Sequence, residues 1–318
     1  MVREKQRTRK RKRAFLSCTP PPSCILPFAM MMPDHRRPHG FRGTTDRLLA
    51  LVAHPDDETA GCGAWLAQSP AALVVFATDG APEPPFFWES FGSRQAYAEL
   101  RAREAGLAAK ELGLGEDEIV FLAAAADQQL YRHLDRAWAG IMQVVERWQP
   151  SVIVTHAYEG GHPDHDACSF LAARVAQQSG IEVWEMPFYH RSGGDLRWQQ
   201  FHDGEQAGDV TQICEGEPLR RKLRAAACHH SQRETLAQFD LSVERFRPQS
   251  THDYTRPPHP GDLNRGQLNY EAWGWPMTGA ELCSAFKEFS AKQRGSIRNA
   301  GRHAKLPTEI MQRRIQKV

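Results

Sequence analysis

Paired cysteines, long apolar runs and a large net charge are all absent from this sequence. The seven cysteines are odd in number, scattered, and include no Cys-x-x-Cys pair, so neither a disulfide framework nor a zinc–thiolate cluster is expected. No stretch approaches the ~18 consecutive apolar residues that a membrane-spanning helix needs. The formal net charge of +2 does not supply the broad basic surface of a nucleic-acid-binding domain. These absences predict a soluble, cytoplasmic protein with reduced cysteines, no transmembrane segment and no nucleic-acid partner for the folded domain.

The start of the chain differs in composition from the rest. Residues 3–13 are strongly basic, and residues 20–22 are all proline, so residues 1–43 are expected to form a disordered extension. The basic run is not followed by the unbroken apolar stretch of a signal peptide. Three consecutive methionines, residues 30–32, directly precede the region with a folding pattern, which favours a mis-assigned translation start as the explanation of the extension.

Residues 44–290 are expected to form one domain, followed by a basic C-terminal tail over residues 291–318. Short apolar runs alternate there with longer amphipathic segments. Strands are predicted at residues 47–53, 72–80, 118–123, 151–157 and 181–189, and helices at residues 59–68, 93–113, 134–149, 168–178 and 222–239. Strands separated by helices form a largely parallel sheet through right-handed crossovers. The predicted fold class is α/β, a Rossmann-like three-layer fold with a mostly parallel sheet and helices on both faces.

Two clusters of acids and imidazoles follow predicted strands. The sequence His-Pro-Asp-Asp-Glu, residues 54–58, follows the first strand, and His-Pro-Asp-His, residues 162–165, follows the fourth. Ligands of an open parallel sheet bind beyond the carboxyl ends of its strands, so the two segments are expected to meet in one crevice. A catalytic zinc site uses three His or carboxylate ligands and keeps a position open for water. His54, Asp57 and His165 supply such a set for Zn²⁺, with Fe²⁺ as another suitable divalent ion.

The remaining groups of the two motifs fit the parts of a hydrolase. If Asp57 binds the metal, its neighbour Asp56 is free to act as a general base toward a bound water. His162 is a candidate to stabilise an oxyanion or to protonate a leaving group, with Asp164 holding its imidazole in one tautomer. Glu58 is expected to interact with the first turn of the following helix, or to orient His54.

Simpler interpretations exist for several of these residues. Two aspartates before a helix often serve only as a solvated cap, although the second motif in register on a later strand favours the metal site. Arg101 could form an ordinary surface ion pair with Glu104. Asp127 either lines the crevice or caps a turn. His229 and its neighbour His230 point to different sides of a helix, so a surface or core role is expected for them.

The stretches AHPDDE and YEGGHPDH together resemble the PIG-L/LmbE family of zinc-dependent N-acetylglucosaminyl deacetylases. Supporting similarity lies in FATDGA, LRAREAGLAAKELG and KLRAAACHHSQ, so that the resemblance covers roughly residues 46–240. It implies hydrolysis of the acetamido group of an amino sugar, which releases acetate and leaves a free amine. The resemblance implies that His54, Asp57 and His165 bind zinc and that Asp56 is the base. It implies that His162 and Asp164 form an acid or charge-relay pair. It also implies that Arg101 holds the substrate.

The resemblance leaves the exact substrate open. Some members of the family place a tyrosine directly upstream of the second motif, where this chain has Gly160 and Gly161, and Tyr158 is not assigned that role. Residues 246–289, with Trp273 and Trp275, lie outside the resemblance and are candidates for substrate selection. The N-acetylated sugar could belong to a glycolipid, a glycoside or a polysaccharide precursor. A metal-dependent amidase for a non-sugar amide and a non-catalytic sugar-binding protein are the alternatives, and the sequence does not indicate an oligomeric state.

Overall fold

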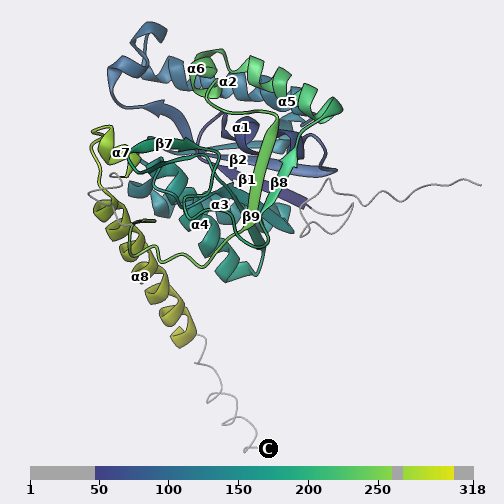
Figure 1. Cartoon of the computed structure of the whole chain (residues 1–318). Coiled ribbons are helices and arrows are strands. Elements are labelled where there is room, and N and C mark those ends of the chain that lie inside the picture. The colour runs from purple at the N-terminus through teal and green to yellow at the C-terminus, as the bar shows by residue number, and fades with distance from the viewer. Residues whose placement is uncertain (1–46, 260–267, 304–318) are drawn as a thin grey trace, which may run out of the picture. The chain divides into compact units, whose positions relative to one another are not determined.

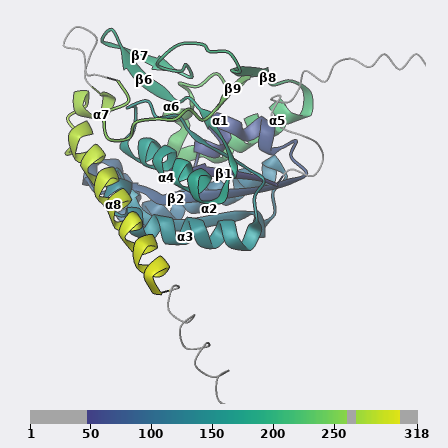
Figure 2. The same cartoon turned by 90° about the horizontal axis from the view of Figure 1, so that it is seen from below.

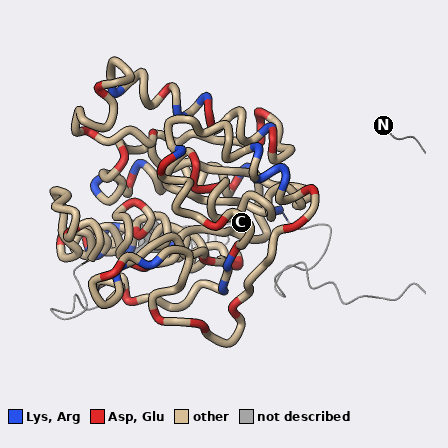
Figure 3. The backbone as a smooth tube through the Cα atoms, turned by 45° about the horizontal axis from the view of Figure 1, so that its top comes forward, with Lys and Arg blue, Asp and Glu red and all other residues tan. Residues whose placement is uncertain are grey.

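The structure, a computed structural model, describes residues 47–259 and 268–303. The extension expected over residues 1–43 therefore lies outside the described residues, as does the end of the chain after His303. Figure 3 shows acidic and basic residues interspersed along the described chain, in keeping with the small net charge. None of the described helices combines the length and the hydropathy that crossing a membrane requires.

A seven-stranded sheet organises the described residues, with the strand order β3-β2-β1-β4-β5-β9-β8. Figure 1 labels β1, β2, β8 and β9 of this sheet. Five strands pair in parallel: β1 Arg47–Val52, β2 Ala71–Pro82, β3 Ile119–Asp127, β4 Val152–His156 and β5 Glu182–Met186. Two antiparallel strands extend one edge: β9 Val243–Pro248 and β8 Val210–Ile213. A separate hairpin joins β6 Tyr189–Ser192 to β7 Asp195–Trp198.

Helices cover both faces of this sheet. The first face carries α1 Asp57–Leu66, α2 Arg94–Leu112, α5 Gly216–Cys228 and the short α6 Arg233–Leu236. The second carries α3 Leu134–Trp148, α4 Pro163–Ser179 and α8 Gly279–His303, which lies along the same side as α3 and α4 in Figure 2. The short α7 Asn269–Ala272 precedes α8, and single 3₁₀ turns lie at Pro85–Phe87, Glu89–Phe91, Glu116–Glu118, Leu130–Arg132 and His230–Gln232. The predicted three-layer α/β class is confirmed.

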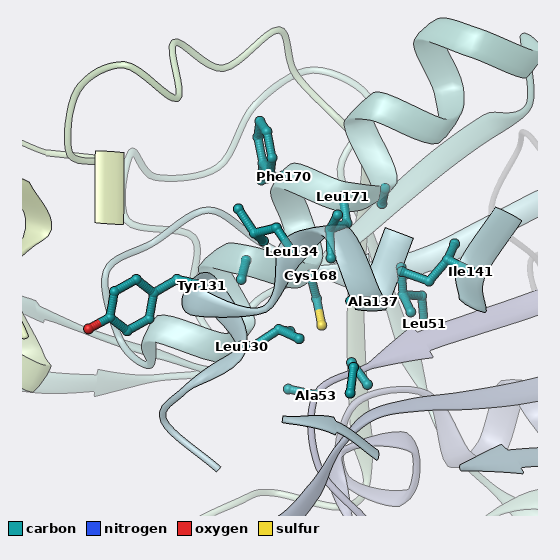
Figure 4. Packing of buried hydrophobic residues seen from close by; sticks show 14 of the residues in the cluster. Leu51, Ala53, Leu130, Tyr131, Leu134, Ala137, Ile141, Cys168, Phe170 and Leu171 are labelled. Atoms are coloured by element: carbon teal, nitrogen blue, oxygen red, sulfur yellow. The ribbon is translucent and has the colours of Figure 1, made fainter. Parts of the chain in front are cut away.

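Strand β1 lies at the centre of both cores. Every residue of the strand except Arg47 is buried, and because alternate side chains point to opposite faces, the strand contributes to each core in turn. Leu49 and Leu51 pack with α3 and α4, whereas Leu48 and Ala50 pack with α1 and α2. Figure 4 shows Leu51 among the side chains of the second face. Burial on both faces explains why β1 reads as an unbroken apolar run.

Two predicted elements are each divided in the structure. The strand expected at residues 181–189 is divided between β5 and β6, with Pro187 and Phe188 between them. The helix expected at residues 222–239 is divided between α5 and α6 by the turn at His230–Gln232.

Helix α8 crosses the boundary at residue 291, where the basic tail was expected to begin. It continues as far as His303, the last described residue. Its apolar side chains Leu282, Phe286 and Phe289 recur at helical spacing and are buried against the second core. This apolar face anchors the helix even though its composition becomes more basic toward the end.

Candidate active site

The turn between β1 and α1 is closed by its own side chains. The backbone N–H of His54 donates to Asp57 Oδ2 at 2.7 Å. Asp56 has a backbone φ of 152°, a left-handed conformation that is costly for a residue other than glycine. Its N–H donates to Glu58 Oε2 at 3.0 Å, so Glu58 stabilises the strained residue rather than orienting His54. The other oxygen of Glu58 lies 3.3 Å from Nε2 of the buried His229.

The three predicted metal ligands meet at one place. His54 Nδ1 lies 3.2 Å from Asp57 Oδ2, and His165 Nε2 lies 3.5 Å from Asp57 Oδ1. The two imidazole rings have centroids 5.3 Å apart. All three side chains are buried. The two motifs, about a hundred residues apart in the chain, therefore converge at the carboxyl ends of β1 and β4, which the strand-end argument predicted.

His162 begins helix α4 and faces the same space. Its Nδ1 accepts a hydrogen bond of 3.1 Å from the backbone N–H of Asp164. In the neutral ring this leaves the proton on Nε2, which lies 3.2 Å from Asp127 Oδ1. The ring is thus oriented at one nitrogen and can donate from the other. Pro163 follows as the first helical residue, where its missing N–H has no cost.

Asp164 contacts His162 through its backbone N–H, whereas its carboxylate has other partners. The carboxylate accepts from the backbone N–H groups of Gln128 at 2.6 Å and Leu130 at 2.9 Å, and its Oδ2 lies 3.2 Å from His54 Nε2. Only the backbone N–H of Asp164 reaches His162. Residues two apart on a helix point in different directions, so the side chain of Asp164 turns toward the loop after β3 and toward His54.

Arg101 approaches the site from α2 and is buried. Its Nη2 donates to Asp56 Oδ1 at 2.9 Å and to the carbonyl of Pro55 at 3.0 Å, and its Nη1 donates to the carbonyl of Gly80. The alternative of a surface pair with Glu104 is wrong, because Glu104 accepts from the backbone N–H and the hydroxyl of Ser231. Arg101 instead holds the candidate base.

Two further residues at strand ends belong to the site. Asp127, the last residue of β3, lies between His54 Nε2 at 3.4 Å and His162 Nε2 at 3.2 Å. His156, the last residue of β4, was not singled out from the sequence. Its Nε2 accepts from the N–H of Ala53 at 3.1 Å and lies 3.3 Å from Asp57 Oδ2. The strand-end rule had already offered Asp127 as a residue of the crevice, and applied to the last residue of β4 it would have found His156 as well.

Tyr158 points away from these groups. Its hydroxyl donates to the carbonyl of Arg256 at 2.6 Å. Tyr189 lies closer, with its ring 5.8 Å from that of His165 and its side chain on the wall of the adjoining cavity.

The buried charges shift one another's pKa values. Burial and the adjacent Asp57 raise the pKa of Asp56 to about 7, although Arg101 opposes the shift. Burial, together with the neighbouring His156, lowers the pKa of His165 well below its ordinary value, which favours the neutral ring that a metal binds. Burial raises the pKa of Asp57, but the imidazoles around it, first His165, outweigh this and keep its pKa well below the ordinary value.

This donor set suits a divalent cation. Three overlapping groups each place one ligand atom per residue within 4.8 Å of the others: His54, His162 and His165; His54, Asp127, His162 and Asp164; Asp57, His156 and His165. Within the described part of the chain, His165 Nδ1 and Asp127 Oδ1 are buried without a hydrogen-bond partner, an unusual condition for buried polar atoms. Imidazole and carboxylate are the donors of catalytic zinc sites.

The site opens into a cavity of ≈ 860 Å³. His54, Asp56, Asp57, Asp127, His162 and His165 line one part of it. Aromatic side chains from the loop after β2, the β6–β7 hairpin and the segment around α7 line much of the rest. The volume lies in the upper part of the range of about 300–1,000 Å³ that small-molecule sites occupy.

Buried imidazoles and carboxylates at the strand ends of a mostly parallel sheet, beside a large cavity, define an α/β protein with a candidate divalent-metal centre. Residues 49–176 match the family profile described as PIG-L: GlcNAc-PI de-N-acetylase. This match confirms the resemblance indicated by the two motifs.

Curated relatives carry deacetylase names. A 1D-myo-inositol 2-acetamido-2-deoxy-alpha-D-glucopyranoside deacetylase from Streptomyces avermitilis is 32% identical over 157 residues, which cover 41% of this chain and 53% of that protein. A probable N-acetyl-alpha-D-glucosaminyl L-malate deacetylase 2 from Bacillus subtilis is 30% identical over 136 residues, which cover 41% of this chain and 60% of that protein. The chain thus spans little more than half the length of these relatives.

Among solved structures, a deacetylase triple mutant of the teicoplanin biosynthetic pathway has 20% sequence identity and a TM-score of 0.49, covering 65% of this chain and 99% of that one.

Proposed function

We propose that this protein is a metal-dependent amide hydrolase that removes the acetyl group from an N-acetylglucosamine-type sugar and releases acetate. The observation that carries the proposal is the Asp56 carboxylate, buried directly beside the candidate ligand Asp57 on the wall of a large cavity. The match to the PIG-L profile and the names of the curated relatives support the sugar substrate.

His54, Asp57 and His165 would hold the cation, with Zn²⁺ as the proposed ion and Fe²⁺ as another divalent ion with the same ligand preferences. The cation would polarise the amide carbonyl and acidify the attacking water. All three side chains are buried and line the cavity, which gives substrate and water access to the cation.

Asp56 would accept the proton of the attacking water. A base is most effective when its pKa is near the working pH, and burial raises the pKa of Asp56 to about 7. Arg101 fixes one carboxylate oxygen by a 2.9 Å hydrogen bond, and Glu58 fixes the backbone N–H. Arg101 also lines the cavity, so its expected contact with substrate remains part of the proposal.

His162 would donate a hydrogen bond to the carbonyl oxygen as negative charge develops there, while the proton that Asp56 accepts from the water would pass to the departing nitrogen. Its Nδ1 is occupied by the N–H of Asp164, so Nε2 is the donor, and Asp127 lies beside that nitrogen. Asp164 acts as a positioning residue in this proposal: its N–H orients His162 and its carboxylate contacts His54. The Nε2 proton stays on His162 and stabilises the negative charge on the carbonyl oxygen.

The test is acetate release from N-acetylglucosamine glycosides by the zinc-loaded protein, followed by mass spectrometry with and without a chelator. Asp56→Asn removes the base but keeps the side-chain shape, so kcat should fall at least about 100-fold. Zinc content, measured by inductively coupled plasma mass spectrometry, should stay at the wild-type level. Asp135→Asn, at an exposed residue of α3, is the matched control.

Other results of this test would support a different function. Turnover of non-sugar amides alone would make the protein a different amidase, and glycan binding without turnover would make it a binding protein. An Asp56→Asn variant that keeps both zinc and full activity would contradict the assignment of the base.

We also place the enzyme in the cytoplasm. The five cysteines within the described residues are free thiols, as expected in a reducing compartment.

A further inference from the structure

The lining of the cavity next to the candidate metal centre becomes more aromatic with distance from the centre. Beyond His162 its wall becomes aromatic, because Trp275 lies with its ring 4.9 Å from that of His162 and Trp273 lies 5.2 Å from Trp275. Tyr189 and Trp198, whose rings are 4.9 Å apart, continue this wall. An acetamido group held at the centre would therefore place the rest of its molecule along these rings.

The aromatic wall is fixed to the second motif. The N–H of Asn269 donates to the carbonyl of Gly160 at 2.9 Å, and its side-chain amide donates to the carbonyl of Gly161 at 3.2 Å. Asn269 is fully buried, and its carbonyl accepts a hydrogen bond of 3.0 Å from the N–H of Trp273. The tryptophan segment is thus held at a set distance from His162 rather than carried by an independent loop.

Several aromatic rings around the opening stay exposed. Trp273 is 45% exposed and Phe91 is 39% exposed although both line the cavity. Large apolar side chains that remain exposed around a concave site mark a binding surface. Phe87, whose ring lies 3.9 Å from that of Phe86, adds to the apolar lining from the loop after β2.

The charges around the cavity disfavour an anionic ligand. Its described lining includes the carboxylates Asp56, Asp57, Glu104, Asp127 and Glu234 but only the arginines Arg101 and Arg233. Arg101 is engaged by Asp56 and by two backbone carbonyls. Arg233 is exposed beside Glu234, where its field is screened and partly cancelled. The proposed cation and Arg101 would offset Asp57 and Asp56, and no other buried Lys or Arg of the described lining remains to pair with a carboxylate or phosphate carried by the substrate.

We infer that Trp273 and Trp275 are specificity-determining residues, and that they select an N-acetylated amino sugar joined to an uncharged, apolar aglycone. The inference rests on the proposed function and deepens it. Aromatic side chains gain free energy by covering the apolar faces of a ligand, whereas the lining offers an anionic aglycone no free buried Lys or Arg as a partner. The aglycone would leave the sugar on the side of His162 and lie along the wall formed by Trp275 and Trp273.

The test compares the zinc-loaded protein on free N-acetylglucosamine, its phenyl and hexyl glycosides, and its L-malyl glycoside, which carries a dicarboxylate aglycone. We expect kcat/KM for the apolar glycosides to exceed that for the malyl glycoside by at least about tenfold. A preference for phenyl over hexyl indicates an aryl aglycone, and the reverse indicates an alkyl one. Equal or higher activity on the malyl glycoside would overturn the inference.

Variants of Trp273 test whether the aromatic wall causes this preference. Trp273→Ala should reduce the ratio of kcat/KM between apolar glycoside and free sugar by about tenfold, and Trp273→Phe should restore part of it. Leu107→Ala, which removes a 55% exposed apolar side chain of α2 outside the cavity lining, should leave the ratio unchanged. An unchanged ratio in Trp273→Ala would also overturn the inference.

Binding without catalysis separates this inference from the proposed function. Calorimetry with phenyl and hexyl glucosaminide, which carry no acetyl group, should give a Kd at least about fivefold weaker for Trp273→Ala than for the wild type. If no glycoside is deacetylated but this difference appears, the proposed reaction fails and the aglycone site stands. If free N-acetylglucosamine is deacetylated but neither glucosaminide binds better than glucosamine, the aglycone site fails and the reaction stands.

Discussion

At the scale of single residues, the site depends on buried polar groups that hold one another in place. His156 lies behind the proposed ligands, with its ring stacked 3.8 Å from that of His165 and its Nε2 3.3 Å from Asp57 Oδ2. Its Nε2 also accepts the N–H of Ala53, at the end of β1. Groups that orient metal ligands in this way commonly contribute to affinity almost as much as the ligands do.

Replacing His156 by Phe should weaken zinc binding by about 10- to 100-fold. The phenyl ring keeps the stack on His165 but offers no acceptor to Ala53 and no polar contact to Asp57. Competition with a chromogenic chelator measures the Kd, and His133→Phe, at an exposed residue before α3, is the control. A wild-type Kd in His156→Phe would show that the stacking alone positions His165.

Glu159 should make the stability of the protein fall as the pH rises. Its Oε1 accepts from the N–H groups of Phe188 and Tyr189, while burial raises its pKa well above the ordinary 4.5. The folded state therefore binds this proton more tightly than the unfolded state, so the contribution of Glu159 to stability is fully present below about pH 4.5 and declines above it, by at most ~1.4 kcal/mol per pH unit.

Glu159→Gln removes this titration and keeps an acceptor for the two N–H groups. Urea unfolding of chelator-treated protein between pH 5 and pH 8 should give a flatter pH profile for the variant than for the wild type. The exposed Glu217→Gln should reproduce the wild-type profile. Parallel profiles for Glu159→Gln and wild type would show that Glu159 is ionised in the folded state.

At the scale of elements, helix α1 carries the motif and is distorted within it. Cys62 has φ −142° and ψ 20°, which interrupts the helix. The N–H groups of Ala64 and Trp65 donate to the carboxylate of Glu244, at 2.7 and 3.1 Å. Lys222, which is fully buried, completes the arrangement with a 2.8 Å ion pair to Glu244. The distortion is thus supported by a charged pair from α5 and β9.

Removing one partner of this pair should destabilise the fold strongly. Glu244→Ala leaves a buried ammonium and two N–H groups unpaired, and should lower the free energy of unfolding by about 3–5 kcal/mol. The double variant Lys222→Met with Glu244→Gln removes the charge and keeps an acceptor, so its loss should be smaller. Urea unfolding measures both, and Arg220→Ala, which breaks an exposed pair with Glu217, should cost less than about 1 kcal/mol. Equal losses in the single and double variants would contradict this account.

At the scale of the whole molecule, the proposed cation would join loops that follow β1 and β4. These strands are neighbours in the sheet, yet the ligands His54 and His165 come from segments far apart in the chain. A ligand that binds only the folded state stabilises it in proportion to the logarithm of its concentration. The metal should therefore contribute to global stability as well as to chemistry.

Chelator treatment should lower the Tm by roughly 5–10 °C when zinc had been present at about 100 times its Kd, which corresponds to ~2.7 kcal/mol. Asp57→Ala should abolish the difference between zinc-loaded and chelated samples in differential scanning calorimetry, whereas Asp135→Asn should retain it. A Tm that does not respond to zinc in the wild-type protein would contradict a metal site formed by the native fold.

The sequence by itself determined the alternation of strands and helices and the positions of both motifs at strand ends. Those features are encoded in contiguous residues, through apolar periodicity and turn chemistry. They were sufficient to predict that His54, Asp57 and His165 would meet.

Only the tertiary structure decided which other groups join them. Asp127 and His156 enter the site, the Asp164 carboxylate turns to His54, and Trp273 comes to line the cavity. Each of these contacts links residues separated by many positions, so it depends on how the helices pack on the sheet and not on any local pattern. Local sequence specifies the elements, whereas the packing of distant elements specifies the neighbours of each functional side chain.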